Sequence, residues 1–211
     1  MFRFSVLKHG VLNLFIASVL ATTVPAFGFA TSQQDRAARR FSLRPAEARR
    51  IIAQRTRGVI SALQRRDMRR LATFVHPTRG VRFSPSPSVS PSDAILTRGE
   101  LVSAWRDRRP DVWGETEAGE INVTFQQYFA EYVYARDFAR VRQVSYNRPR
   151  SHGNNSNTLR DNYPQAILVE YHSPGRDPRF DGMDWQSLWL VFERAGRDWY
   201  LVGIAHDEWA I

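Results

Sequence analysis

The chain has 211 residues, 30 basic against 21 acidic side chains for a formal net charge of +9, and no cysteine. Its apolar fraction of 43% and aromatic fraction of 12% are ordinary for a packed globular protein and too high for a disordered chain. Without cysteine, the chain has no disulfide scaffold, no Cys-ligated zinc or iron–sulfur site and no thiol nucleophile.

The first thirty residues have the pattern of a secretory signal peptide. A basic start that includes Lys8 precedes the apolar, uncharged run 11–21, and small residues flank the expected cleavage position after Ala30. An uncleaved membrane anchor is the alternative, but the run is about ten residues long and a spanning helix needs about twenty. We therefore predict an exported mature chain, periplasmic or secreted, without a transmembrane segment.

Charge is unevenly distributed along the chain. Residues 36–82 hold 14 arginines against two acids, whereas residues 83–211 hold 14 arginines against 18 acids. A basic segment of this kind can bind an anionic polymer or lipid headgroups, or it can be a solvated helix face. Nucleic acid is not an expected partner, because export separates the protein from the nucleic acid of the cell and no nucleic-acid motif is present. The candidate anion-binding residues are Arg65, Arg66, Arg69 and Arg70.

Two helices are predicted after an Arg-rich polar linker at 31–44. Pro45 suits the first position of a helix, and Asp67 suits the N-cap of a second helix over 68–75. His76 is expected to cap the C-terminus of that second helix or to pack there. The apolar residues of the first helix that recur on one face are Ile51, Ile52, Val59, Ile60 and Leu63.

The middle of the chain combines a loop with two helix starts. Residues 84–93 are rich in Ser and Pro and predict an irregular connection. Thr97 with Glu100, and Thr124 with Gln127, form capping-box patterns that open helices. The second of these helices has an apolar stripe at helical spacing that consists of Phe125, Tyr128, Phe129, Tyr132 and Val133.

The period of the pattern changes to two from about residue 139, which predicts strands. The expected strands are 139–146, 165–172, 185–194 and 199–206, and the last two are joined by a short turn at 195–197. The strand 185–194 is apolar on both faces, which is typical of a strand in the middle of a covered sheet. We predict one α+β domain over 45–211, with N-terminal helices packed on a curved, mostly antiparallel C-terminal sheet.

Four segments of the chain carry a family resemblance: 75–85, 170–175, 182–192 and 199–211. Together with the helix, turn and short helix that end at His76-Pro77, and with the final strands, they resemble a family of exported bacterial proteins with a nuclear-transport-factor-like (SnoaL-like) cone fold. The similarity covers about residues 45–211. It implies the cone fold and an exported location, and it implies no reaction.

The strands carry the residues with the strongest chemical potential. Glu170 and His172 are two residues apart and therefore project from the same face of one strand, and His206 and Asp207 end the last strand. If the strand 185–194 lies between these two, the imidazoles of His172 and His206 could approach each other across the sheet. A carboxylate beside them would give a general base or a two-His, one-carboxylate metal site. The alternative is a set of structural side chains, and we expect no metal and no cofactor.

Aromatic side chains offer a second kind of candidate site. Tyr128, Tyr132, Trp185 and Trp189 either belong to the core or line an apolar pocket between the helices and the sheet. Three functions follow from these patterns. The first is a module that binds a small ligand or a protein in an apolar pocket. The others are an enzyme that uses the His/carboxylate cluster on a small molecule, and an envelope-associated protein that binds anionic polymer. The partner is an unidentified small molecule or envelope component, and a homodimer is left open.

Overall fold

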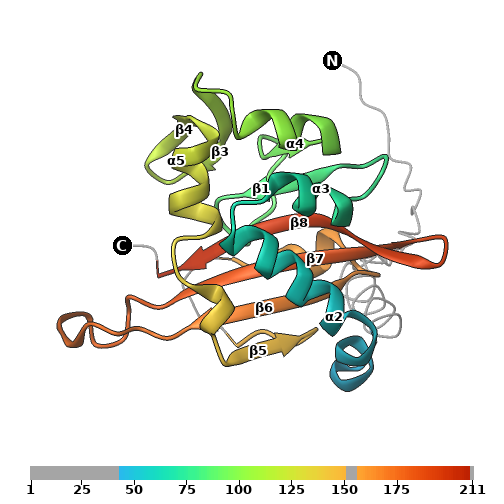
Figure 1. Ribbon diagram of the computed structural model, residues 1–211. Helices are drawn as coiled ribbons and strands as arrows, with labels where there is room; N and C mark the ends of the chain where they lie inside the picture. The colour runs from blue at the N-terminus through green and yellow to red at the C-terminus, as the bar shows by residue number, and fades with distance from the viewer. Residues whose placement is uncertain (1–42, 151–155, 210–211) are drawn as a thin grey trace, which may run out of the picture.

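The computed structural model describes residues 43–150 and 156–209, and its ribbon is drawn in Figure 1. The predicted signal peptide and residues 31–42 of the predicted linker lie outside these described residues. Among the helices of the described ranges, none has both the length and the apolar character that a bilayer crossing requires.

Helices α2 (Pro45–Gln64) and α3 (Met68–Phe74) form as the sequence predicts. Pro45 occupies the first turn of α2, and the Asp67 side chain caps α3 by accepting a hydrogen bond from the backbone amide of Arg70. The prediction of the buried face of α2 is wrong for one residue. Ile51 is 38% exposed, because it lies on the flank of α2 rather than on the buried side. The two helices lie against one face of the main sheet (Figure 1).

The main sheet has six strands in the order β2-β1-β8-β7-β6-β5, and only the β1–β8 pair is parallel. The fold is therefore α+β with a mostly antiparallel sheet, and the four strands predicted from the sequence are present. The first of them starts later than predicted, because the chain makes a turn of 3₁₀ helix, η2 (Phe138–Arg140), before it. The strands are β1 (Val81–Ser84), β2 (Ala94–Leu96), β5 (Gln143–Tyr146), β6 (Ile167–Ser173), β7 (Gln186–Ala195) and β8 (Asp198–Glu208).

A smaller unit covers one end of the sheet. It contains helix α4 (Arg98–Ala104) and the hairpin of β3 (Asp111–Thr116) and β4 (Gly119–Val123), followed by α5 (Phe125–Tyr128). Both predicted capping boxes are confirmed at the starts of α4 and α5. The remaining short elements are the π-helical turn η1 (Phe129–Val133), α6 (Leu159–Asn162) and the 3₁₀ turn η3 (Pro178–Phe180).

Strand β7 lies between β6 and β8 and is buried on both faces, as predicted. Leu188, Leu190 and Phe192 face the helices and join the larger hydrophobic cluster. Trp189 and Val191 face the opposite side and join a second cluster with α6 and the Ser/Pro-rich loop. The side chains of β7 therefore separate two layers of core, and any residue paired with β7 belongs to one layer or the other.

His76 is buried just after α3 and packs there against the ring of Tyr200, which confirms one of the two roles predicted for it; it does not cap the helix. Helix α3 ends at Phe74 with Val75 as its C-cap, and the imidazole Nδ1 of His76 accepts hydrogen bonds from the backbone amides of Thr78 (3.3 Å) and Arg79 (3.1 Å) in the next turn. Nδ1 can accept these bonds only while it carries no proton. Burial and the cations of Arg79 and Arg98 lower the pKa of His76, which favours this neutral form.

We predict that His76 makes folding stability fall in mild acid. A histidine with a lowered folded-state pKa contributes its full stability above its unfolded pKa, about 6.5, and loses it as the pH falls through the folded-state value. His76→Asn keeps an oxygen that can accept from the same two amides but does not titrate. Urea unfolding at about pH 8 and about pH 5 should therefore show the native protein losing stability relative to His76→Asn at the lower pH. An equal difference at both pH values would contradict this role.

Candidate functional site

The two strand histidines lie on opposite faces of the sheet, so the predicted pairing of His172 with His206 is wrong. His172 pairs with Ser187 on β7, whereas His206 pairs with the next residue, Leu188. Neighbouring residues of a strand project to opposite faces, and directly paired residues share a face. The two imidazoles therefore cannot open into one cavity or bind one metal ion.

A β-bulge is the physical reason for this separation. From the turn outward, β7 and β8 pair without a shift as far as Phe192 with Leu201. The next pair is Val191 with Gly203, so one extra residue, Val202, is inserted into β8. An uninterrupted register would have paired His206 with Ser187 on the same face as His172. The bulge instead turns His206 toward the helices.

The face that carries His172 holds a chain of three hydrogen-bonded side chains. Ser187 lies on the central strand, and its hydroxyl donates to Oε1 of Glu170 at 2.9 Å. The same hydroxyl oxygen lies 2.9 Å from Nδ1 of His172. Glu170 and Ser187 are completely buried, and Glu170 also accepts from the Ser145 hydroxyl and from the Arg150 backbone amide. These bonds to three different segments hold the carboxylate in place.

This arrangement determines which nitrogen of His172 carries the proton. A serine hydroxyl has one hydrogen, and that of Ser187 is donated to Glu170. The contact between Ser187 and His172 therefore needs its hydrogen from the imidazole, so Nδ1 is protonated. The ring of Trp185 packs against this imidazole with a centroid separation of 5.6 Å. The predicted association of Glu170 with His172 is therefore present, with Ser187 as an intermediate that the sequence did not indicate.

Asp207 lies on the same face, one strand further along, because it pairs with Ser187 from the other side. It is buried, and the indole of Trp189 donates to its Oδ2 at 3.5 Å. Asp207 is therefore separated from His206, its neighbour in the sequence. Within the described ranges, His and acidic side chains do not gather into a group of three with metal-binding geometry.

His206 occupies the helix-covered face near the open end of the sheet. Its ring is 2% exposed and meets the edge of the Tyr132 ring at 5.9 Å. Its Nε2 lies 3.2 Å from Oε2 of Glu208, and this nearby imidazole is the main reason why the pKa of Glu208 is below its usual value. Burial raises the pKa of Tyr132 to about 12, so its hydroxyl keeps its proton at neutral pH.

The four aromatic candidates do not form one group, although two of them stack on each other. Tyr128 is buried in the helix-side cluster and stacks on Tyr132. Trp189 is equally buried but belongs to the cluster on the opposite face, and Trp185 lies with His172. These side chains pack within two layers of core or beside His172, and they do not line one pocket.

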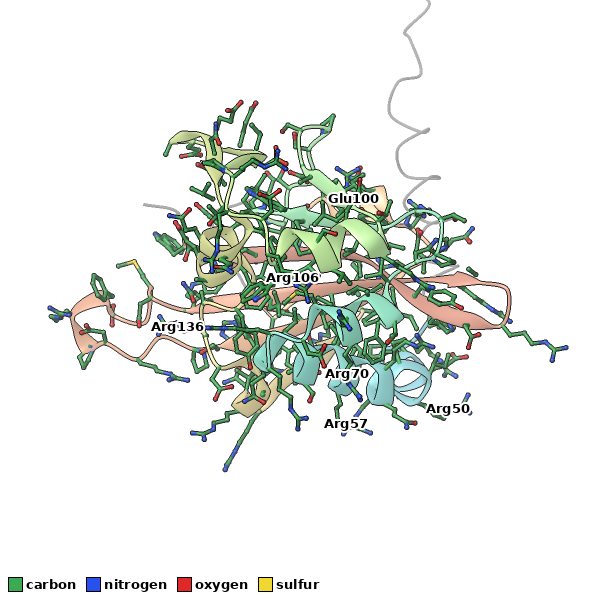
Figure 2. All side chains as sticks on the ribbon, turned by 45° about the horizontal axis from the view of Figure 1, so that its top comes forward. Arg50, Arg57, Arg70, Glu100, Arg106 and Arg136 are labelled. Atoms are coloured by element: carbon green, nitrogen blue, oxygen red, sulfur yellow. The ribbon has the colours of Figure 1, made fainter. Side chains whose placement is uncertain are left out.

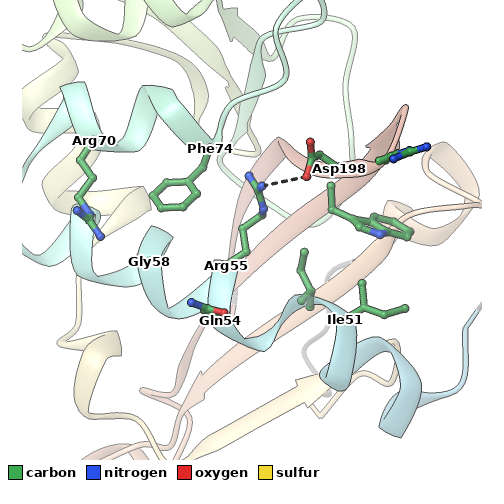
Figure 3. A pocket seen from close by; sticks show the side chains of 10 residues that line it. Ile51, Gln54, Arg55, Gly58, Arg70, Phe74 and Asp198 are labelled. Carbon is green, nitrogen blue, oxygen red and sulfur yellow. Dashed lines mark ion pairs between the residues drawn. The ribbon is translucent and has the colours of Figure 1, made fainter.

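A groove does exist at a place that the sequence did not indicate. It lies between α2, α3 and the turn that joins β7 to β8, and its volume is about 560 Å³ (Figure 3). Three arginines and one aspartate line it, so its net charge is positive. The lining residues are Ile51, Ile52, Gln54, Arg55, Gly58, Arg70, Phe74, Arg197, Asp198 and Trp199.

Arg55 is the central polar side chain of this groove. Its guanidinium lies 5.9 Å from the ring centre of Phe74 and 5.4 Å from that of Tyr200, and its side chain is 27% exposed. The nearest carboxylate, Asp198, is 3.9 Å away, beyond hydrogen-bond distance, and is itself largely exposed. Among the described residues, Arg55 has no hydrogen-bond acceptor for its side chain. Two aromatic rings therefore hold a mostly covered guanidinium whose donors face the groove.

Gly58 explains how the wall of the groove fits against α2. A Cβ atom at this position would lie 2.6 Å from Cζ of Phe74, so only glycine lets the ring rest on the helix backbone. A glycine inside a helix costs about 1 kcal/mol relative to alanine, which makes it a visible signal in the sequence. That signal points to a close contact on the Gly58 side of α2, but not to its partner.

The predicted anion-binding arginines are all exposed at the junction of α2 and α3. Arg70 lines the groove, and in Figure 3 Phe74 lies between Arg70 and Arg55. Arg65, Arg66 and Arg69 lie outside the groove lining, and Arg66 has a left-handed backbone with φ of 56° at the helix junction.

Searches against protein-family models, curated proteins and solved structures find no match for this chain.

We predict that Glu170→Gln reverses the direction of the hydrogen bonds to His172. The Arg150 amide needs an oxygen at the Oε2 position, so the new NH₂ group must face Ser187 and donate to it. The Ser187 hydrogen is then available for Nδ1 of His172, and the imidazole proton should move to Nε2. The ¹⁵N chemical shifts of this imidazole report the change, and Ser145→Ala is a control that leaves the Ser187 bond intact. An unchanged tautomer in Glu170→Gln would refute the assignment.

Proposed function

We propose that this protein is an exported ligand-binding module whose groove, between α2, α3 and the β7–β8 turn, binds an organic anion. The observation that carries the proposal is Arg55: a guanidinium held between two aromatic rings, mostly covered, with donors that lack an acceptor among the described residues. A planar guanidinium matches a carboxylate or phosphate, with which it can form two parallel hydrogen bonds.

The rest of the groove supports an anion that carries an apolar group. Arg70 and Arg197 add positive charge at its rim, and Phe74, Trp199 and the exposed Ile51 supply apolar surface beside Arg55. Aromatic and apolar walls with a few placed polar groups are typical of small-ligand sites. Asp198 is a weak internal competitor, because it approaches Arg55 without reaching hydrogen-bond distance.

The export of the protein and its cone-like fold belong to the same proposal. The signal-peptide pattern of residues 1–30 supports export. Helices on one face of a mostly antiparallel sheet are compatible with the nuclear-transport-factor-like arrangement that the sequence resembles. In the proposed function, the ligand binds on the outer side of the helices rather than between them and the sheet, which differs from the apolar pocket expected from the sequence.

We predict that Arg55→Gln weakens the binding of an aromatic anion by about tenfold or more, since a hydrogen bond to a charged group contributes about 1.5–3 kcal/mol. The probe is 1-anilinonaphthalene-8-sulfonate, followed by its fluorescence and by calorimetry. Gly58→Ala should also weaken binding, because the added methyl displaces Phe74. Asp198→Asn should bind the probe at least as tightly as the native protein, because it removes the competing carboxylate.

Arg57→Gln is the matched control. Arg57 is an exposed arginine on the same helix, two residues from Arg55 and outside the groove lining. It should leave probe binding unchanged. Equal binding by Arg55→Gln and the native protein, or equal losses in Arg55→Gln and Arg57→Gln, would refute the groove as the site.

A further inference from the structure

The eight arginines of α2, α3 and the turn between the two helices differ from most others in the described chain. Seven of the eight project into solvent and have neither a hydrogen bond from the side chain nor an ion pair within the described residues. The exception is Arg55, which belongs to the groove. The seven are Arg49, Arg50, Arg57, Arg65, Arg66, Arg69 and Arg70.

Most arginines elsewhere have partners. Arg82 and Arg98 donate to backbone carbonyls, and Arg136 pairs with Asp184 and Gln186. Neutralising partners also occur on exposed surfaces, as with Asp107 for Arg109. Further arginines with partners are Arg79, Arg108, Arg140, Arg160, Arg179 and Arg194. Arginines without a partner are therefore more frequent on α2, α3 and the turn between them than in the rest of the described chain.

The local acids do not neutralise this surface. The two acids of this segment are Glu47, in the first turn of α2, and Asp67, whose carboxylate is used to cap α3. Arg50 and Arg57 are seven residues apart, which is about 10 Å along a helix. Figure 2 shows Arg50, Arg57 and Arg70 along the same side of the molecule. The positive charges thus form an extended row, and an anionic partner would reduce their mutual repulsion.

We propose that this row, formed by the outer surface of α2 and α3, binds a linear anionic polymer that carries phosphate or carboxylate groups along its length. Arg50 and Arg57, about two helical turns apart, cannot converge on one small anion, but each can meet a different group of a polymer. A lipid bilayer is less well matched. The exposed large apolar side chain of this region is Ile51, which lines the groove, so the row itself offers arginine rather than apolar surface for insertion.

Among the seven arginines of the row, Arg70 alone also lines the groove. Arg50, Arg57, Arg65 and Arg69 do not line the groove, whereas Arg55 and Arg197 do. Each function can therefore be removed without the other.

The test is the binding of long-chain inorganic polyphosphate and of polygalacturonate to the purified protein at about 50 and about 200 mM salt. Replacing Arg50, Arg57, Arg65 and Arg69 together by Gln should weaken binding at least tenfold at low salt and flatten the salt dependence, since fewer counterions are released. Arg66 is kept because of its left-handed backbone, and Arg70 because it lines the groove. Circular dichroism checks that the variant retains its helices.

A second quadruple variant controls for net charge. Arg106, Arg142, Arg148 and Arg176 are exposed, lie outside α2 and α3, and make no side-chain hydrogen bond or ion pair with another described residue. Replacing them by Gln removes the same four charges and should leave most of the polymer binding in place. Arg55→Gln should also bind polymer normally, even if it loses the aromatic anion.

Three outcomes would overturn the proposal. Equal losses in the two quadruple variants would make the effect one of net charge. Competition by inorganic orthophosphate at the same phosphate concentration would reveal a site for a single anion rather than a polymer. Binding to phosphatidylglycerol vesicles without binding to either polymer would assign the surface to a membrane.

Discussion

The position of β7 in the middle of the sheet determines on which face of the sheet each polar side chain of β6 and β8 lies. This strand pairs along its length with β6 and β8 and is buried on both faces, so its alternating side chains separate two hydrophobic layers. Through the register of pairing, each side chain of β6 and β8 lies on the same face of the sheet as the β7 residue opposite it. A polar residue on β6 or β8 therefore belongs either to the layer beneath the helices or to the opposite layer, and a shift of one residue changes its layer.

The sequence was sufficient for elements whose signals are local. Pro45, Asp67 and the two capping boxes identified helix starts, and the alternation within each strand identified the four later strands. Strands β1 to β4 were not predicted. The first of these has four residues and pairs in parallel with β8, more than a hundred residues later in the chain. No local pattern encodes that pairing.

The prediction of a catalytic site shared by His172 and His206 was wrong because one extra residue, Val202, is inserted into β8. The sequence correctly placed Glu170 and His172 on one face and β7 between its two partners, and these two facts suggested that the histidines meet. Leu201 and Ile204 both face the helix-side core although they are three residues apart, which is the signature of the bulge at Val202. Because all the residues around the bulge are apolar, either register buries them, and the sequence pattern does not choose between the two.

The sheet therefore holds its polar side chains in two separate and largely buried groups, while the accessible chemistry lies on α2 and α3. The same helix serves two surfaces because its flanks differ. One flank, with Arg55 and Gly58, faces an aromatic side chain and the β7–β8 turn, which cover the guanidinium and orient it. The opposite side carries arginines whose side chains are exposed to solvent. Enclosure favours one ligand of defined shape, and an open row of charge favours a long partner. The proposed ligand site and the proposed polymer-binding surface thus use arginines of the same segment that differ in their structural surroundings.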